Sequence, residues 1–253
     1  MTVYVYGYGF RPSPSIQEQL LTFSFGGHTF AVKADCRTAL YEMILEVVDY
    51  DSYQLKKLDW ARGGDHNIVD IGANVGVTAL VLAQIPGARV TCYEPDPQNC
   101  ALLRENVENN GLKNVTVREA AVGPSNGKLP FRLHAESTGG SLAPNSYSSD
   151  AKMTSVDAVT LDLAVAESAG NGEIALLKCD CEGGEYDLIE QLTPSLASRI
   201  RNLTIEVHDL DQRRNVGWIS GKLSGFGYEV SCIPDLWERG ALHLLLARQP
   251  ARR

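Results

Sequence analysis

One stretch, residues 68–80, constrains the fold of this chain more than any other. It begins as a short β-branched apolar run, breaks into small residues with two glycines, and resumes as an apolar run of helical character. This pattern predicts a strand, a tight turn and a helix, because glycine permits turns that other residues resist. Such a turn is typical of nucleotide-binding α/β folds. The turn residues are Gly72, Ala73, Asn74, Val75 and Gly76.

The acid before the turn narrows the choice of ligand. Asp70 stands near the end of the first strand, and the G-x-x-x-G spacing lacks the middle glycine of the dinucleotide fingerprint. A carboxylate there would repel a pyrophosphate at the helix N-terminus, but it suits a ligand that carries an ammonium and a sulfonium. S-adenosylmethionine is such a ligand. The alternative is that the glycines only allow close helix–strand packing and that Asp70 caps the helix.

A second acid follows the next strand pattern, residues 89–93. This strand ends at Glu94, Pro95 and Asp96, about 20 residues past the turn, where doubly wound folds place the carboxylate that accepts the ribose hydroxyls. Nicotinamide cofactors and S-adenosylmethionine both use such an acid. Glu94 therefore supports a nucleotide cofactor without distinguishing the two, whereas Asp70 favours S-adenosylmethionine.

A third strand pattern, residues 115–118, ends at Glu119, Ala120 and Ala121. Small residues at this place would admit an adenine ring, and Glu119 or a backbone group could meet its amino group. Simple packing of the two alanines is the alternative.

Composition limits the partners. The chain has 253 residues, 44% of them hydrophobic and 21% charged, and a net charge of −8. This acidic balance argues against a nucleic-acid surface, which would carry a basic stripe. The six cysteines show no paired C-x-x-C spacing, no signal-like segment opens the sequence, and no apolar run reaches membrane-spanning length. We expect a cytoplasmic protein that binds neither nucleic acid nor membranes, with a homodimer left open.

Residues 1–60 form a predicted N-terminal extension. A Ser-x-x-Glu capping box at Ser13–Glu18 predicts a short helix, and alternation around Gly-Gly within Thr22–Val32 predicts a hairpin. An amphipathic helix is expected to begin at Asp35 as its N-cap. The extension is either a structural cap on the sheet or, around Tyr50–Tyr53, a cover on the substrate side.

Residues 61–253 alternate between strand and helix patterns, and seven core strands fit. The later strands are expected at 174–179, 203–208, 228–233 and 242–246. Between the third and fourth lie about 50 residues without a clear crossover helix, with extra strands at 129–133 and 156–161. We expect an insertion at about 123–160 whose segment His134 to Asp150 acts as a lid over the acceptor site. A disordered surface loop is the alternative for 144–150.

These motifs resemble those of one known family. The motifs are Val69 to Gly76, Tyr93-Glu94-Pro95, the Lys-x-Asp-x-Glu-Gly-x-Glu string from Lys178 to Glu185, and Ile205-Glu206-Val207-His208. Over roughly residues 50–247 the chain resembles the FkbM family of S-adenosylmethionine-dependent methyltransferases, with the Lys-x-Asp string as its specific element. Cys179 and Cys181 stand where that family commonly has apolar residues.

The resemblance implies both a fold and an activity. The fold is an α/β, class I methyltransferase Rossmann-like seven-stranded sheet, with the last strand antiparallel and helices on both faces. The activity is O-methylation of a hydroxyl on a small molecule, a sugar or a natural product.

In-line methyl transfer to a hydroxyl requires that the protein align the acceptor and take up its proton. Carboxyl ends of strands bind ligands in open α/β sheets, which selects Asp180, Glu182, Glu206 and His208. The usual pKa range of histidine suits His208 as the base. Glu206 could orient it from the same strand, Asp180 faces them, and Lys178 and Glu185 read as structural.

Other chemistries remain open at this stage. Asp180, Glu206 and His208 could instead hold a divalent ion that lowers the hydroxyl pKa, with Mn²⁺ or Zn²⁺ preferred over Mg²⁺. A carboxylate or nitrogen acceptor on a small molecule or peptide is another alternative. A nicotinamide-dependent oxidoreductase is more remote because of Asp70.

Overall fold

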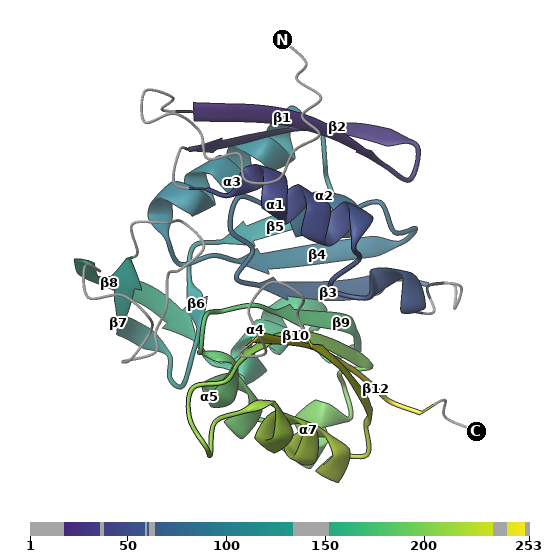
Figure 1. Cartoon of the computed structure of the whole chain (residues 1–253), viewed down its shortest axis with the longest axis vertical. Helices are drawn as coiled ribbons and strands as arrows, with labels where there is room; N and C mark the ends of the chain where they lie inside the picture. The colour runs from purple at the N-terminus through teal and green to yellow at the C-terminus, as the bar shows by residue number, and fades with distance from the viewer. Residues whose placement is uncertain are drawn as a thin grey trace.

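A central sheet with helices on both faces forms the body of the protein (Figure 1). A two-stranded hairpin lies at one end of the molecule, and a separate three-stranded sheet stands beside one edge of the central sheet. The computed structural model describes residues 18–35, 38–58, 60, 64–133, 152–234 and 242–250. The predicted lid segment, His134 to Asp150, lies outside the described residues.

The central sheet has seven strands in the order β11-β12-β10-β9-β3-β4-β5. They are β3 (His66–Ile71), β4 (Ala88–Tyr93), β5 (Val115–Arg118), β9 (Ile174–Cys179), β10 (Asn202–His208), β11 (Glu229–Pro234) and β12 (Leu242–Arg248). Strands β3, β4, β5, β9 and β10 are parallel, while β12 runs antiparallel to both of its neighbours. The predicted seven-stranded sheet with a reversed last strand is confirmed.

Alternation along the strands divides the core into two layers. Ile68 packs on the face covered by α1 (Leu40–Ile44), α2 (Val77–Leu82) and α3 (Pro97–Asn109), whereas Val69 packs on the other face. That second face is covered by α4 (Leu161–Ala169), α5 (Glu185–Glu190), α6 (Pro194–Ala197) and α7 (Val216–Gly225). Strands buried on both faces are nearly continuous in apolar residues. From Ile68 onward β3 fits this rule except at Asp70, and β9 fits it except at Lys178.

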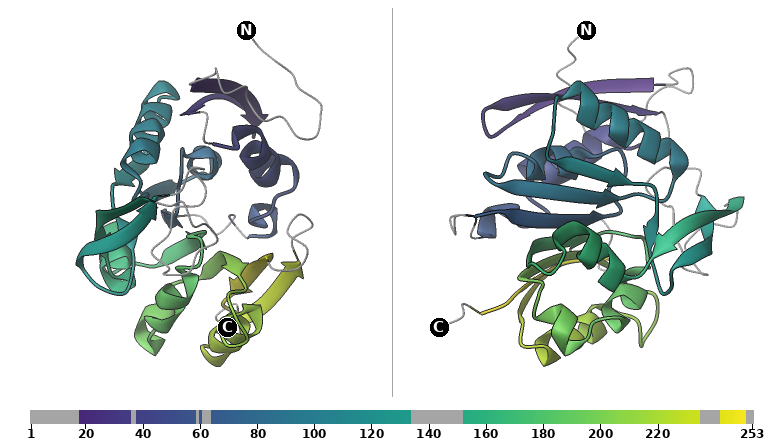
Figure 2. Two further views of the ribbon diagram at one scale, coloured as in Figure 1. Left: turned by 60° about the vertical axis from the view of Figure 1, so that its left-hand side comes forward. Right: turned by 180° about the vertical axis from the view of Figure 1, so that it is seen from behind.

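The N-terminal hairpin pairs β1 (Glu18–Phe25) with β2 (His28–Asp35) around Gly26 and Gly27, as predicted. Figure 2 shows it lying along α3. Two amide side chains of α3 bond the backbone of β2 as a neighbouring strand would. Asn106 exchanges hydrogen bonds of 2.8 Å with the backbone N–H and carbonyl of Lys33, and Asn110 does the same with Ala31 at 3.0 and 2.8 Å.

Two expectations for the extension are wrong. Glu18, the last residue of the predicted capping box, is the first residue of β1 and so is not helical, while residues 13–17 lie outside the described residues. Asp35 ends β2 by pairing with Glu18 and is not a helix cap. Helix α1 begins later, with Ala39 at its N-cap, and continues directly into a π-helical turn, Leu45–Asp49. A separate 3₁₀ turn, Leu55–Lys57, follows after a non-helical segment.

The insertion after β5 contains a small sheet and then a crossover helix. Strands β6 (Ala121–Val122), β7 (Gly127–Leu133) and β8 (Lys152–Val159) form the small sheet in the order β6-β8-β7. The expected strand at 156–161 ends at Val159, because Thr160 caps α4 by accepting a hydrogen bond from the Leu163 backbone N–H. The expectation that no crossover helix precedes the fourth core strand is therefore wrong.

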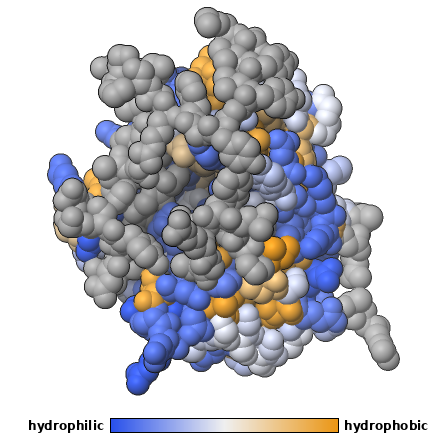
Figure 3. Space-filling model, viewed as in Figure 1, coloured by the Kyte–Doolittle hydropathy of each residue, from blue (hydrophilic) through white to orange (hydrophobic). Residues whose placement is uncertain are grey.

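The described surface carries few large apolar side chains of high exposure. They come from separate elements: Leu20 on β1, Tyr50, Met153 on β8 and Ile233 on β11. On the face shown in Figure 3, outside the grey atoms, hydrophilic residues border the apolar ones. Isolated exposed apolar residues of this kind are ordinary for a folded protein.

Candidate functional site

The turn after β3 is tightly built. Gly72 and Gly76 both have positive φ angles, of 73° and 97°, and so does Asn74 at 50°. A Cβ atom at Gly72 would overlap the carbonyl oxygen of Asp180, and one at Gly76 would overlap the side chain of Leu103. Close packing therefore requires glycine at both positions. The absence of a Cβ at Gly72 also lets the turn lie directly against the end of β9.

Glu94 lies beside this turn at the end of β4. Its two carboxylate oxygens accept backbone N–H groups, from Asn74 at 2.8 Å and from Asp96 at 2.9 Å. Burial, partly offset by these two donors, raises the pKa of Glu94 to about 7. Asp96 itself caps α3, where its carboxylate accepts the N–H groups of Gln98 and Asn99. Pro95 joins the two acids.

Asp70 is fully buried, and its charge faces a lysine that the sequence interpretation had treated as a structural strand-end charge. The Lys178 Nζ lies 3.3 Å from Asp70 Oδ1 and 3.3 Å from Asp180 Oδ2, and donates to the Gly72 carbonyl at 2.9 Å. Burial raises the pKa of Asp70, an effect that the Lys178 cation opposes. Burial also disfavours the lysine cation, but Asp70 and Asp180 outweigh it and raise the pKa of Lys178.

The ion pair with Lys178 neutralises the Asp70 charge inside the fold. That Asp70 contacts the cofactor stays a prediction. Neither Asp70 oxygen has a well-formed hydrogen bond within the described part of the chain. A lysine in an otherwise apolar strand was the available signal, because a lysine is almost never fully buried unless it is paired.

The N-terminal extension also enters the site. The Tyr53 hydroxyl donates a hydrogen bond of 2.7 Å to Asp180 Oδ2, and Lys178 Nζ lies 5.0 Å from the centre of the Tyr53 ring. Tyr53 is buried, whereas Tyr50 is half exposed. Sequence reasoning could not pair position 53 with position 180, because no local pattern links residues so far apart.

His208 ends β10 among three carboxylates. Its Nε2 lies 3.3 Å from Glu182 Oε2 and 3.7 Å from Glu206 Oε1, and its Nδ1 lies 3.4 Å from Glu185 Oε1. Burial disfavours the cation, but Glu182 and Glu185 outweigh it and raise the pKa of His208 to about 12. A pKa in this range favours the imidazolium form at neutral pH and argues against a neutral histidine base. The assignment of His208 as the base stays a prediction.

The carboxylates around His208 differ in role. Glu185 is fully buried and accepts the backbone N–H groups of Gly183 and His208, which ties the turn after β9 to the end of β10. Burial and the nearby Asp180 charge raise the pKa of Glu206 well above its usual range, and His208 opposes this shift. Burial likewise raises the pKa of Glu182.

The geometry gives no support to the metal alternative. Among the residues that the structure describes, no group of three or more His, Cys, Asp or Glu side chains is arranged as a metal site. The two ring nitrogens of His208 face the carboxylates of Glu182 and Glu185.

The residues that directly follow β5 pack against the rest of the fold. Glu119 forms an ion pair with Arg104 of α3, 2.9 Å apart, and both side chains are about half exposed. Ala120 packs in the core of the central sheet and Ala121 in the core of the small sheet. The packing interpretation of the alanines accounts for both residues, while Glu119 remains open to solvent beside them.

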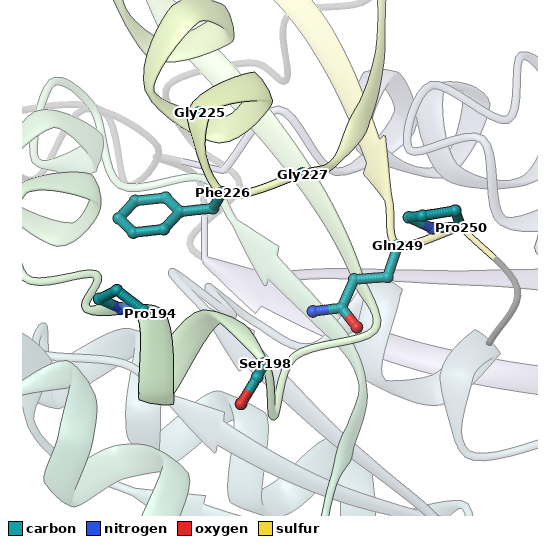
Figure 4. A pocket seen from close by; sticks show the side chains of 7 residues that line it. All are labelled: Pro194, Ser198, Gly225, Phe226, Gly227, Gln249 and Pro250. Atoms are coloured by element: carbon teal, nitrogen blue, oxygen red, sulfur yellow. The ribbon is translucent and has the colours of Figure 1, made fainter.

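A pocket of about 540 Å³ lies elsewhere. Figure 4 shows its lining residues: Pro194, Ser198, Gly225, Phe226, Gly227, Gln249 and Pro250. These residues precede β10 and β11 or follow the antiparallel β12, so they lie at the edge of the sheet opposite the glycine turn. The pocket is therefore separate from the candidate site.

In the part of the chain that the structure describes, no helix combines the length and the apolar character needed to cross a bilayer.

Comparison with known proteins places these residues in a family. Residues 70–230 match the methyltransferase FkbM domain. The chain is 31% identical over 140 residues to the 2-O-methyltransferase NoeI of Sinorhizobium fredii, a match that covers 49% of this chain and 56% of NoeI. It is 26% identical over 219 residues to the 31-O-demethyl-FK506 methyltransferase FkbM of Streptomyces tacrolimicus, covering 75% of this chain and 83% of that protein.

A solved structure shows the same fold. The human methyltransferase 10 domain containing protein superimposes with a TM-score of 0.50 at 15% identity, and the match covers 82% of each chain. The aligned region spans little more than half of the length of NoeI. The domain match takes in the glycine turn, Glu94 and the residues at the ends of β9 and β10. The chain therefore belongs to the FkbM methyltransferase family and has the class I methyltransferase fold.

Proposed function

We propose that this protein uses S-adenosylmethionine to methylate a hydroxyl group of a small molecule, a sugar or a natural product. One observation carries the proposal. The glycine turn with Glu94 and the charged groups of Asp180, Glu206 and His208 lie at the carboxyl edge of neighbouring parallel strands. A nucleotide cradle thus adjoins an acid–base cluster. The names of the two curated relatives, both O-methyltransferases, support a hydroxyl as the acceptor.

The residues present fit this cofactor. A carboxylate has about four lone-pair sites, so Glu94 can accept ribose hydroxyls beside the two N–H groups that it already binds. The turn from Gly72 to Gly76 would lie against the cofactor, with Glu119 and Ala120 beside its adenine. The orphaned oxygens of Asp70 can accept from a donor that enters the turn. Bound S-adenosylmethionine would supply a methyl group activated by its sulfonium.

Asp180, Glu206 and His208 have different roles in this proposal. The acceptor hydroxyl would lie between Asp180 and Glu206, whose side chains are 22% and 17% exposed. Glu206 would take up the hydroxyl proton as the acceptor oxygen receives the methyl group. Burial raises the pKa of Glu206, which makes its ionised form a stronger base than an ordinary carboxylate and lowers the fraction that is ionised. The His208 imidazolium holds Glu182 and Glu206 in place and keeps a positive charge beside them.

Radiolabelled S-adenosylmethionine, tested against a panel of methyl glycosides and 31-O-demethyl-FK506, tests the proposal. We expect label in at least one acceptor, with activity retained in EDTA. Glu206→Gln should lower kcat by roughly 10²–10⁴ while the affinity for S-adenosylhomocysteine stays within about twofold. Glu229→Gln, at an exposed glutamate on β11, is the matched control and should behave as the wild type.

Two results would count against this mechanism. Activity lost in EDTA and restored by Mn²⁺ would transfer the chemistry to a metal. Label found only in amines or carboxylic acids from an extended panel would refute the hydroxyl acceptor.

A further inference from the structure

We infer that Tyr53 is a positioning residue that orients Asp180 toward the acceptor. The N-terminal extension, which carries Tyr53, thereby contributes a residue to the site. Tyr53 lies outside residues 70–230, the segment matched by the family domain. The inference rests on the proposed function, because it assigns Asp180 to the acceptor. It concerns a contact within this chain that neither the domain match nor the relatives assign.

Hydrogen bonds fix the conformation of the turn that carries Tyr53. Asp51 and Gln54, two residues that flank Tyr53, adopt left-handed backbone conformations with φ of 50° and 55°. Such conformations cost free energy in residues other than glycine and persist only when the surroundings impose them. The Asp51 carboxylate does so by accepting the N–H groups of Leu55 at 2.7 Å and Lys56 at 3.1 Å.

A second anchor fixes the backbone of Tyr53 to the sheet. The Thr204 hydroxyl of β10 donates a hydrogen bond of 3.0 Å to the Tyr53 carbonyl. Thr204 points to the same face of β10 as Glu206, two residues further along the strand. The extension is therefore attached next to the group that we assign as the proton acceptor.

From this anchored position the Tyr53 side chain reaches into the ion-pair network. Its ring covers Lys178 and its hydroxyl donates to Asp180 Oδ2, the oxygen that Lys178 also approaches. Two donors on Oδ2 fix the orientation of the carboxylate and leave Oδ1 as the oxygen that can meet an acceptor hydroxyl. Glu46, from the π-helical turn of the same extension, adds negative charge near Tyr53 and Glu206.

The alternative is that Tyr53 only fills space, since it is 5% exposed. Tyr53→Phe separates the two roles, because it keeps the ring, its packing and its contact with Lys178 and removes only the hydroxyl. Tyr50→Phe, at the half-exposed tyrosine three positions earlier, is the matched control.

The decisive experiment is a double-mutant cycle with Asp180→Asn. The assay uses the methyl glycoside or macrolide that the wild type turns over fastest in the screen above. One charge-assisted hydrogen bond corresponds to roughly a 10- to 150-fold change. Tyr53→Phe should lower kcat/KM for the acceptor within that range and leave S-adenosylhomocysteine affinity within about twofold. In the Asp180→Asn background the same change should have almost no further effect.

A structure of Tyr53→Phe with S-adenosylhomocysteine gives a readout that needs no acceptor: the Asp180 carboxylate should be rotated or disordered relative to the wild type. Wild-type activity in Tyr53→Phe, equal losses in both backgrounds, or an unmoved Asp180 carboxylate would overturn the inference. A wild-type protein that binds no S-adenosylhomocysteine would instead refute the proposed function.

Discussion

At the scale of single residues, the site depends on how buried charges are paired. Lys178 is the only residue of β9 that is not apolar, and it holds together the glycine turn, the end of β9 and the buried Asp70. The Asp180 carboxylate also forms an ion pair with Lys178. Charges removed from water in this way are tolerated because they face one another. The ion pairs of Lys178 with Asp70 and Asp180 are thus needed for the fold as well as for the proposed chemistry.

Lys178→Met should therefore destabilise the protein strongly. It leaves Asp70 buried without a counter-ion, and breaking a buried pair from one side costs about 3–5 kcal/mol. Urea unfolding measures the change. Lys128→Met, at a surface lysine paired with Asp157 and 64% exposed, is the control and should change the free energy of unfolding by less than about 0.5 kcal/mol. Equal, small effects for both variants would contradict the pairing described for Lys178.

Glu94 should make cofactor affinity depend on pH. Its pKa of about 7 in the folded protein lies above the usual value, so its contribution to stability is full at low pH and is lost as pH rises through 7. Ribose hydroxyls donate to the charged carboxylate, so binding favours the ionised form. Affinity for S-adenosylhomocysteine should rise roughly tenfold between pH 6 and pH 8.

Calorimetry at several pH values checks the prediction for Glu94. Glu94→Gln should weaken binding at least tenfold at pH 8, by loss of charge-assisted hydrogen bonds, and should abolish the pH dependence. A slope retained in Glu94→Gln would assign the ionisation to another group.

At the scale of elements, one side chain attaches the N-terminal hairpin to the glycine turn. Asn106 of α3 bonds both backbone groups of Lys33 in β2 and also donates to the Val75 carbonyl at 2.8 Å. The hairpin, α3 and the glycine turn therefore meet at a single buried amide. A displacement of the hairpin would therefore also displace the glycine turn.

Asn106→Ala should loosen this junction. It leaves backbone groups of Lys33 and Val75 without partners, at about 1–3 kcal/mol for each group that stays buried. Thermal unfolding and hydrogen exchange of β2 measure the effect, with Asn109→Ala, an exposed asparagine on the same helix, as the control. If β2 exchanges no faster in Asn106→Ala than in the control, the amide does not hold the hairpin.

The elements also show what a sequence can predict here. Strand β9 was predictable because a strand buried on both faces is a nearly continuous apolar run, and the expected 174–179 matches it. The expected 115–118 matches β5, in which valines alternate with exposed polar residues. Helix α4 was missed because its apolar start, Leu161, continues the run of β8 with only Thr160 between them. The contacts of Asn106, Tyr53 and Lys178 join distant segments. The pKa of His208 depends on Glu182 in the turn after β9 and on Glu185 at the start of α5. Local patterns carry no information about such pairings.

At the scale of the whole molecule, the two edges of the central sheet differ. The carboxyl edge gathers the glycine turn, Glu94 and the charged network, while the opposite edge carries the pocket between α6 and β12. The side chain of Tyr53 brings the N-terminal extension to the carboxyl edge. The residues that we propose to bind the cofactor and the acceptor therefore gather at one end of the molecule.

Calorimetric titration of the wild-type protein with S-adenosylhomocysteine and, separately, with NAD tests this account most directly. The account predicts saturable binding of one S-adenosylhomocysteine per chain with micromolar affinity, about −8 kcal/mol, and no measurable heat from NAD. Binding of NAD without S-adenosylhomocysteine would contradict it, because the charged groups around Asp70 and Glu94 would then serve a different cofactor.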